Sequence, residues 1–87
     1  MAQLVQVIAE QKNQNGAYVH VDTEYFSDAE AIKDWMSGAV EWADRFRIFD
    51  NREGYSNFFY EGLVVNGVIP KWEKKSLIDS KILNVYA

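Results

Sequence analysis

Cysteine is absent from this chain of 87 residues, and proline occurs only once. Without cysteine the chain has no disulfide framework, no thiolate metal site and no thiol nucleophile. Small extracellular domains usually need such cross-links, so we expect a cytoplasmic protein. No segment approaches the ~20 apolar residues of a membrane-spanning helix, and the first residues lack the basic and apolar regions of a signal peptide.

The motifs of nucleotide-binding proteins and hydrolases are also missing. The chain contains neither G-x-G-x-x-G nor a phosphate-binding lysine motif, and no glycine elbow marks a nucleophile. Acidic residues cluster near residues 22–28 and 50–54, but neither cluster has the alternating ligand pattern of a calcium loop. We therefore expect no enzymatic activity, no metal and no cofactor.

His20 is the only histidine. It lies two residues from both Tyr18 and Asp22, and the three side chains of such a strand project from one face. A histidine beside a carboxylate can act as an oriented general base. Because nothing else in the sequence supplies a nucleophile, we interpret His20 as a surface residue.

Aromatic residues are abundant, with three Trp, five Tyr and five Phe. The chain is long enough for a single core, so we expect one domain, residues 1–87. Large rings supply much of the apolar area of a small core, and surplus rings tend to lie at interfaces.

The segment from Ser27 to Gly38 is the predicted helix. Ser27 and Glu30 form an S-x-x-E capping box, and Gly38 is expected at the C-terminal cap. An apolar stripe with three- and four-residue spacing consists of Ala29, Ile32, Trp35 and Met36.

Strands are expected at residues 4–10, 17–22, 45–49 and 55–65. Asn66-Gly67 predicts a two-residue type I′ hairpin in which Val65 pairs with Val68. Pro70 has no N–H to donate, so the pairing should weaken there or the strand should lie at an edge. The basic segment 71–75 is interpreted as a turn. Residues 39–44 and 76–86 each fit either a helix or a strand.

These elements predict an α+β fold. About five antiparallel strands, arranged as a hairpin, a helix and a meander, would form a small sheet with one amphipathic helix packed on a face.

Charge is distributed unevenly along the chain. The net charge is −4, but residues 1–44 carry eight acidic and two basic residues, and residues 45–87 carry five acidic and seven basic residues. Five acidic residues lie on the helix and the approach to it: Asp22, Glu24, Asp28, Glu30 and Asp34. They predict an acidic face that meets a basic partner. A solvated surface with chance clustering is the alternative.

The second half of the chain offers a basic, aromatic surface instead. Its candidate residues are Arg45, Arg47, Arg52, Tyr55, Trp72, Lys74 and Lys75. Basic side chains beside exposed rings bind single-stranded nucleic acids. The negative net charge and a pI near 4.8 weigh against this interpretation.

The general profile is compact, acidic, cysteine-free and rich in aromatic residues. In type, though not in sequence motif, it is similar to small proteins that act by binding. These include phage-encoded inhibitors of host defence, such as anti-CRISPR and anti-restriction proteins, and toxin-neutralising immunity proteins. The similarity implies a stoichiometric inhibitor that blocks a basic surface of a protein partner, for example one meant for nucleic acid. A nucleic-acid-binding module, or an assembly protein that dimerises through a strand edge, is the alternative.

Overall fold

The part of the chain that the structure describes forms one antiparallel sheet of five strands and one helix, which confirms the predicted α+β class. The structure is a computed structural model that describes residues 5–50 and 58–76. Its elements are β1 (Val5–Lys12), β2 (Tyr18–Phe26), α1 (Ala29–Ala39), β3 (Arg45–Asp50), β4 (Phe58–Leu63) and β5 (Trp72–Ser76).

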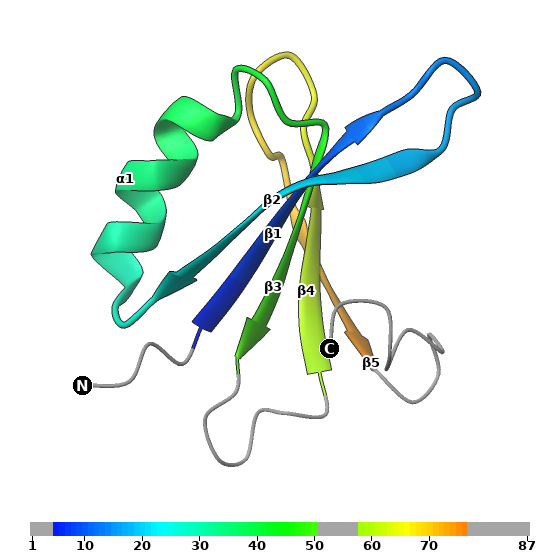
Figure 1. The fold of residues 1–87 in the computed structure, drawn as a ribbon. Helices are drawn as coiled ribbons and strands as arrows, with labels where there is room; N and C mark the ends of the chain where they lie inside the picture. The colour runs from blue at the N-terminus through cyan, green and yellow to red at the C-terminus, as the bar shows by residue number, and fades with distance from the viewer. Residues whose placement is uncertain (1–4, 51–57, 77–87) are drawn as a thin grey trace.

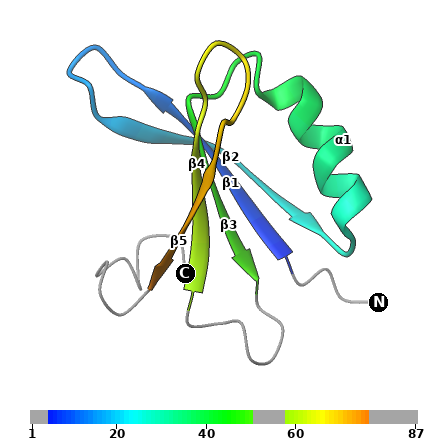
Figure 2. The ribbon, with the colours of Figure 1, turned by 180° about the vertical axis from the view of Figure 1, so that it is seen from behind.

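The strand order is β2-β1-β3-β4-β5, so β2 and β5 are the edges and β4 is an interior strand. The chain leaves the edge strand β2, forms α1 and returns to the sheet at β3. Figures 1 and 2 show α1 beside β2, whereas β5 lies on the opposite side of the sheet. We call the sheet face that carries α1 the helix face, and the other the far face.

The main core lies between α1 and the helix face. Met36 and Ala39 of α1 pack on Val7, Ala9 and Phe46 of β1 and β3. These five side chains are almost fully buried. Burying a Phe or Met side chain contributes about 1.5–3 kcal/mol, so this contact holds the helix on the sheet.

Trp35 links the helix to the surrounding rings. Its ring centroid lies 5.8 Å from that of Phe26, 5.9 Å from that of Phe46 and 6.2 Å from that of Trp42. The predicted apolar stripe is thus confirmed at Trp35 and Met36, but Ala29 is exposed.

The helix begins one residue later than predicted. Asp28, not Ser27, is the N-cap: its backbone is extended and its Oδ1 accepts a hydrogen bond from the Ala31 N–H at 2.8 Å. The predicted capping box is therefore wrong, because Glu30 lies two residues after the cap instead of three. Asp and Ser are equally good caps, so the sequence did not choose between them.

The helix also ends later than predicted. It runs through Gly38 to Ala39, with Val40 as the C-cap in a right-handed conformation. Residues 40–44 form a turn held by hydrogen bonds from Trp42 and Ala43 to the Ala39 carbonyl. The ambiguous segment 39–44 is therefore neither a strand nor a long continuation of the helix. The strand expected from Arg45 is confirmed as β3.

A bulge changes the faces of β2. Consecutive residues of β1 pair with Asp22 and His20, so Val21 is an extra residue. The extra residue places His20 and Asp22 on opposite faces of the sheet. The prediction that both share a face with Tyr18 is therefore wrong for Asp22.

The Asn66-Gly67 hairpin is confirmed. Both residues have positive φ, 53° and 79°, as a type I′ turn requires. Val65 and Val68 exchange both backbone hydrogen bonds, at 2.7 and 3.2 Å. Before the turn, two residues separate Gly62 from Val65. After the turn, three residues separate Val68 from Trp72, the residue of β5 that pairs with Gly62. Because the two sides differ in length, regular pairing is interrupted around Pro70.

The segment 71–75 is not a turn, because most of it belongs to the edge strand β5. Charged residues, especially lysines, are common on edge strands because they deter pairing with other chains. Residues 51–57, which include Arg52 and Tyr55, lie outside the described residues, and so does most of the ambiguous segment 76–86. The predictions for these residues stay predictions.

Candidate binding surfaces

Two of the five predicted acidic residues form a pair on β2. Asp22 and Glu24 lie opposite Ala9 and Val7, so their side chains project from the helix face at the edge of the sheet. Asp22 Oδ1 accepts a hydrogen bond from the Thr23 N–H at 2.9 Å. A side-chain hydrogen bond with Asp22 raises the pKa of Glu24 above its ordinary value of 4.5, and partial burial and the charge of Asp22 act in the same direction. Asp22 thus disfavours the ionised form of Glu24.

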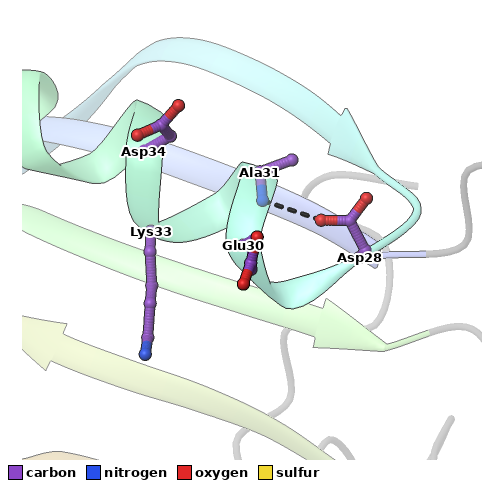
Figure 3. A pocket seen from close by; sticks show the side chains of 5 residues that line it. All are labelled: Asp28, Glu30, Ala31, Lys33 and Asp34. Carbon is purple, nitrogen blue, oxygen red and sulfur yellow. Dashed lines mark hydrogen bonds between the residues drawn. The ribbon is translucent and has the colours of Figure 1, made fainter.

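The other three acidic residues line an open hollow on α1. Its lining consists of Asp28, Glu30, Ala31, Lys33 and Asp34. Figure 3 shows Asp34 and Lys33 pointing to opposite sides of the helix, with Glu30 on the side of Lys33. The lining therefore contains three carboxylates and one cation, and Asp28 already has a structural role as the N-cap.

We call these five residues (Asp22, Glu24, Asp28, Glu30 and Asp34) the acidic surface. All five come from β2, from α1 or from the link between them. Within the described residues, no hydrogen bond or ion pair joins the pair on β2 to the three on α1. The acidic surface is therefore a charged region on two adjacent elements, without the converging geometry of a metal or catalytic site.

His20 has a different neighbour from the one expected. The bulge places Thr23 next to it on the far face, where His20 Nε2 and Thr23 Oγ1 are 2.6 Å apart. Asp22 lies on the other face, so the orienting carboxylate proposed from the sequence is not beside this histidine.

The alternative basic surface is divided between the two faces. Arg45, Arg47 and Lys75 lie on the far face, whereas Trp72 and Lys74 lie on the helix face. The structure therefore does not bring the predicted basic residues together.

The three cations of the far face contact two carboxylates instead. Arg45 Nε lies 2.6 Å from Glu10 Oε1, and Lys75 Nζ lies 2.7 Å from Glu61 Oε2. Arg47 Nε lies 3.5 Å and 3.4 Å from the same two glutamates. The Glu10 side chain is 1% exposed, and those of Glu61, Arg45 and Arg47 are 12–14% exposed.

This ion cluster spans β1, β3, β4 and β5 and stabilises their register. Removing one partner of a buried ion pair typically costs about 3–5 kcal/mol, because the other charge stays buried. The Arg45 guanidinium also lies 3.9 Å from the centre of the Tyr18 ring. Sequence reasoning missed Glu10 and Glu61. The sequence did contain a signal for them, because each is an acidic residue within an apolar strand. In the sheet, both face the alternating arginines of β3.

A separate group of exposed rings lies on the helix face of β4 and β5. Phe58 and Tyr60 of β4 and Trp72 of β5 are 40%, 38% and 38% exposed. Lys74 lies directly opposite Tyr60, and its Nζ is 4.3 Å from the centre of the Phe58 ring. We call these four residues the aromatic face. Trp72 and Lys74 of this group belong to the basic, aromatic surface expected from the sequence.

Among residues 5–50 and 58–76, no group of three or more His, Cys, Asp or Glu side chains is placed to hold a metal ion. The single helix of this part of the chain is too short and too polar to cross a membrane.

Comparison with known proteins places the chain in no group: no family model, no curated protein and no solved structure matches it.

Proposed function

We propose that this protein is a non-catalytic binding module whose acidic surface docks onto a basic surface of a protein partner. In this proposal it acts as a stoichiometric inhibitor that covers the partner's basic surface, in the manner of anti-CRISPR, anti-restriction or immunity proteins. The expected target is a basic surface with which the partner binds nucleic acid, because carboxylates can occupy the positions of phosphates.

The observation that carries the proposal is the Asp22–Glu24 pair. Asp22 raises the pKa of Glu24, and the negative charge of Asp22 is one of the causes. Ionising Glu24 in the folded chain therefore works against the repulsion from Asp22. A Lys or Arg of a partner would relieve the repulsion and favour the ionised pair.

The helix supports the same interpretation. Glu30 and Asp34 are four residues apart, a spacing at which like charges cost a helix a few tenths of a kcal/mol. Both line the same open hollow as Asp28, where a partner's basic side chains would meet three carboxylates.

The nucleic-acid-binding alternative has less support. Arg45, Arg47 and Lys75 would have to bind phosphates, but all three contact the carboxylates of Glu10 and Glu61. Their charge is therefore largely neutralised within the protein.

The test is affinity capture from the source cell with a charge-reversed variant. Glu30→Lys combined with Asp34→Lys reverses two exposed charges and keeps the Asp28 cap. We expect wild type to recover a protein with a basic surface in a one-to-one complex, and this variant to lose it.

The matched control is Glu41→Lys combined with Glu73→Lys. It makes the same change in net charge at exposed positions outside the acidic surface. The control should retain the partner. Equal capture by wild type and the Glu30/Asp34 variant, or equal loss in both variants, would contradict the proposal.

A further inference from the structure

The helix covers only part of the helix face. Core contacts of α1 are made with β1 and β3, and Figures 1 and 2 show β4 and β5 on the side of the sheet away from α1. The aromatic face (Phe58, Tyr60, Trp72 and Lys74) occupies this uncovered part. Three rings with 38–40% exposure in one cluster are unusual for a surface that only meets water.

The Trp72 ring is held in place by the strand beside it. Trp72 lies opposite Gly62, and a Cβ atom at Gly62 would lie 2.7 Å from its ring carbon Cζ3. The glycine therefore lets the ring pack directly against the backbone of β4. Lys74 is likewise held over Phe58. The Trp72 and Phe58 rings thus have fixed neighbours, which lowers the entropy lost when a partner binds.

The chemistry of the face favours a protein over a nucleic acid. Single-stranded nucleic acids need several cations that follow the phosphates beside the stacked bases. On β5 only Lys74 projects from this face, because Lys75 lies on the far face and contacts Glu61. Clustered Trp, Tyr and Phe with few charges is the composition of the centre of a protein interface.

A second copy of the chain is also a poor match. A two-fold contact centred on Lys74 would bring together the two copies of this lysine. Like charges that meet at an interface disfavour association.

We propose that the aromatic face is a second docking surface, for a protein segment with apolar side chains and a carboxylate placed to meet Lys74. This partner differs in charge from the basic partner of the acidic surface, and the proposal does not depend on the proposed function. The two surfaces lie toward opposite edges of the sheet, on β2 with α1 and on β4 with β5, so the domain would hold two partners at once.

The test is selection of binders from a random peptide library displayed on phage, with the wild-type protein as the target. We expect enriched peptides that combine aromatic or aliphatic residues with Asp or Glu. Tyr60→Ser should weaken their binding by at least about tenfold, a loss typical of a central interface aromatic. Lys74→Glu, which keeps all three rings, should also weaken them by repelling their carboxylates.

Val68→Ser is the matched control, because Val68 is 60% exposed at the hairpin and lies outside the aromatic face. It should leave the affinity of the selected peptides unchanged. If Tyr60→Ser does not fold, Lys74→Glu and Phe58→Ser provide the same test.

Three results would overturn the proposal. The first is that no selected peptide depends on Tyr60 or Lys74. The second is binding of an oligothymidylate that Tyr60→Ser abolishes, which would assign the face to nucleic acid. The third is self-association that Tyr60→Ser abolishes, which would assign it to a second copy.

Discussion

Asp28 has both a structural and an electrostatic role at the start of α1. Its Oδ1 accepts the hydrogen bond that satisfies the Ala31 N–H, and its charge lies at the positive end of the helix dipole. Its carboxylate also belongs to the acidic surface. A variant made to test binding should therefore leave Asp28 in place.

Asp28→Ala should lower the free energy of unfolding by about 0.5–2 kcal/mol, because it removes the N-cap. Ser27→Ala is the matched control and should have a smaller effect, since Ser27 precedes the cap. The measurement is the midpoint of chemical denaturation for the two variants. A larger loss in Ser27→Ala than in Asp28→Ala would restore the capping box expected from the sequence.

The Asp22–Glu24 pair predicts a pH dependence of stability. The raised pKa means that folded Glu24 binds its proton more tightly than unfolded Glu24 does. Its contribution to stability is therefore fully present below 4.5, the ordinary value, and is lost as the pH rises through the raised pKa.

Asp22→Asn removes the charge and lowers the pKa of Glu24 toward its ordinary value. We expect this variant to lose less stability than wild type between pH 4.5 and neutral pH. Thermal unfolding across this range measures the difference. Parallel pH profiles for wild type and Asp22→Asn would show that the two carboxyls do not interact.

The hairpin and the helix each contain one glycine, and replacing these two glycines should change the stability in opposite directions. Gly67 has a φ of 79°, which an L-residue adopts at a cost of about 1–2 kcal/mol. Gly38 lies inside α1 with no atom within 4 Å of an added Cβ. Gly67→Ala should therefore destabilise the protein, whereas Gly38→Ala should stabilise it by up to about 1 kcal/mol.

Urea denaturation of both variants measures these opposite shifts. A loss of stability in Gly38→Ala would show that the helix does not continue through residue 38. Wild-type stability in Gly67→Ala would contradict the type I′ turn.

Elements with strong local signals could be predicted from the sequence. The Asn66-Gly67 turn was predictable because two adjacent positive φ values strongly favour this pair. The apolar stripe of α1 was predictable because Trp35 and Met36 follow Ile32 at three- and four-residue spacing, and all three pack in or against the core. The strands expected at 4–10, 17–22 and 45–49 from their apolar and β-branched residues correspond to β1, β2 and β3.

Features that depend on pairing between distant strands could not be predicted. The bulge at Val21 exists only in the register of β2 against β1, and it alone decides that Asp22 joins Glu24 instead of His20. Likewise, Arg45 and Arg47 look like free cations in the sequence. Only the sheet order β1-β3-β4 places them against Glu10 and Glu61.

At the scale of the whole molecule, the fold converts an uneven charge distribution along the chain into distinct surfaces. The first half supplies an acidic surface on β2 and α1. The basic residues of the second half that the structure describes are partly neutralised in the ion cluster of the far face. Arg45 and Arg47 are therefore mostly buried and paired, whereas the carboxylates of the acidic surface and Lys74 of the aromatic face stay available to a partner.

The central claim is that the acidic surface binds a basic partner, and the most direct test is the association rate constant with the captured partner. It should be measured at low and physiological salt for wild type, for Glu30→Lys/Asp34→Lys and for the control Glu41→Lys/Glu73→Lys. We expect wild-type association to slow as salt shortens the Debye length toward ~8 Å, and the Glu30/Asp34 variant to associate more slowly with little salt dependence. The control should behave as wild type. Association rates that change with neither salt nor charge reversal at Glu30 and Asp34 would contradict the claim.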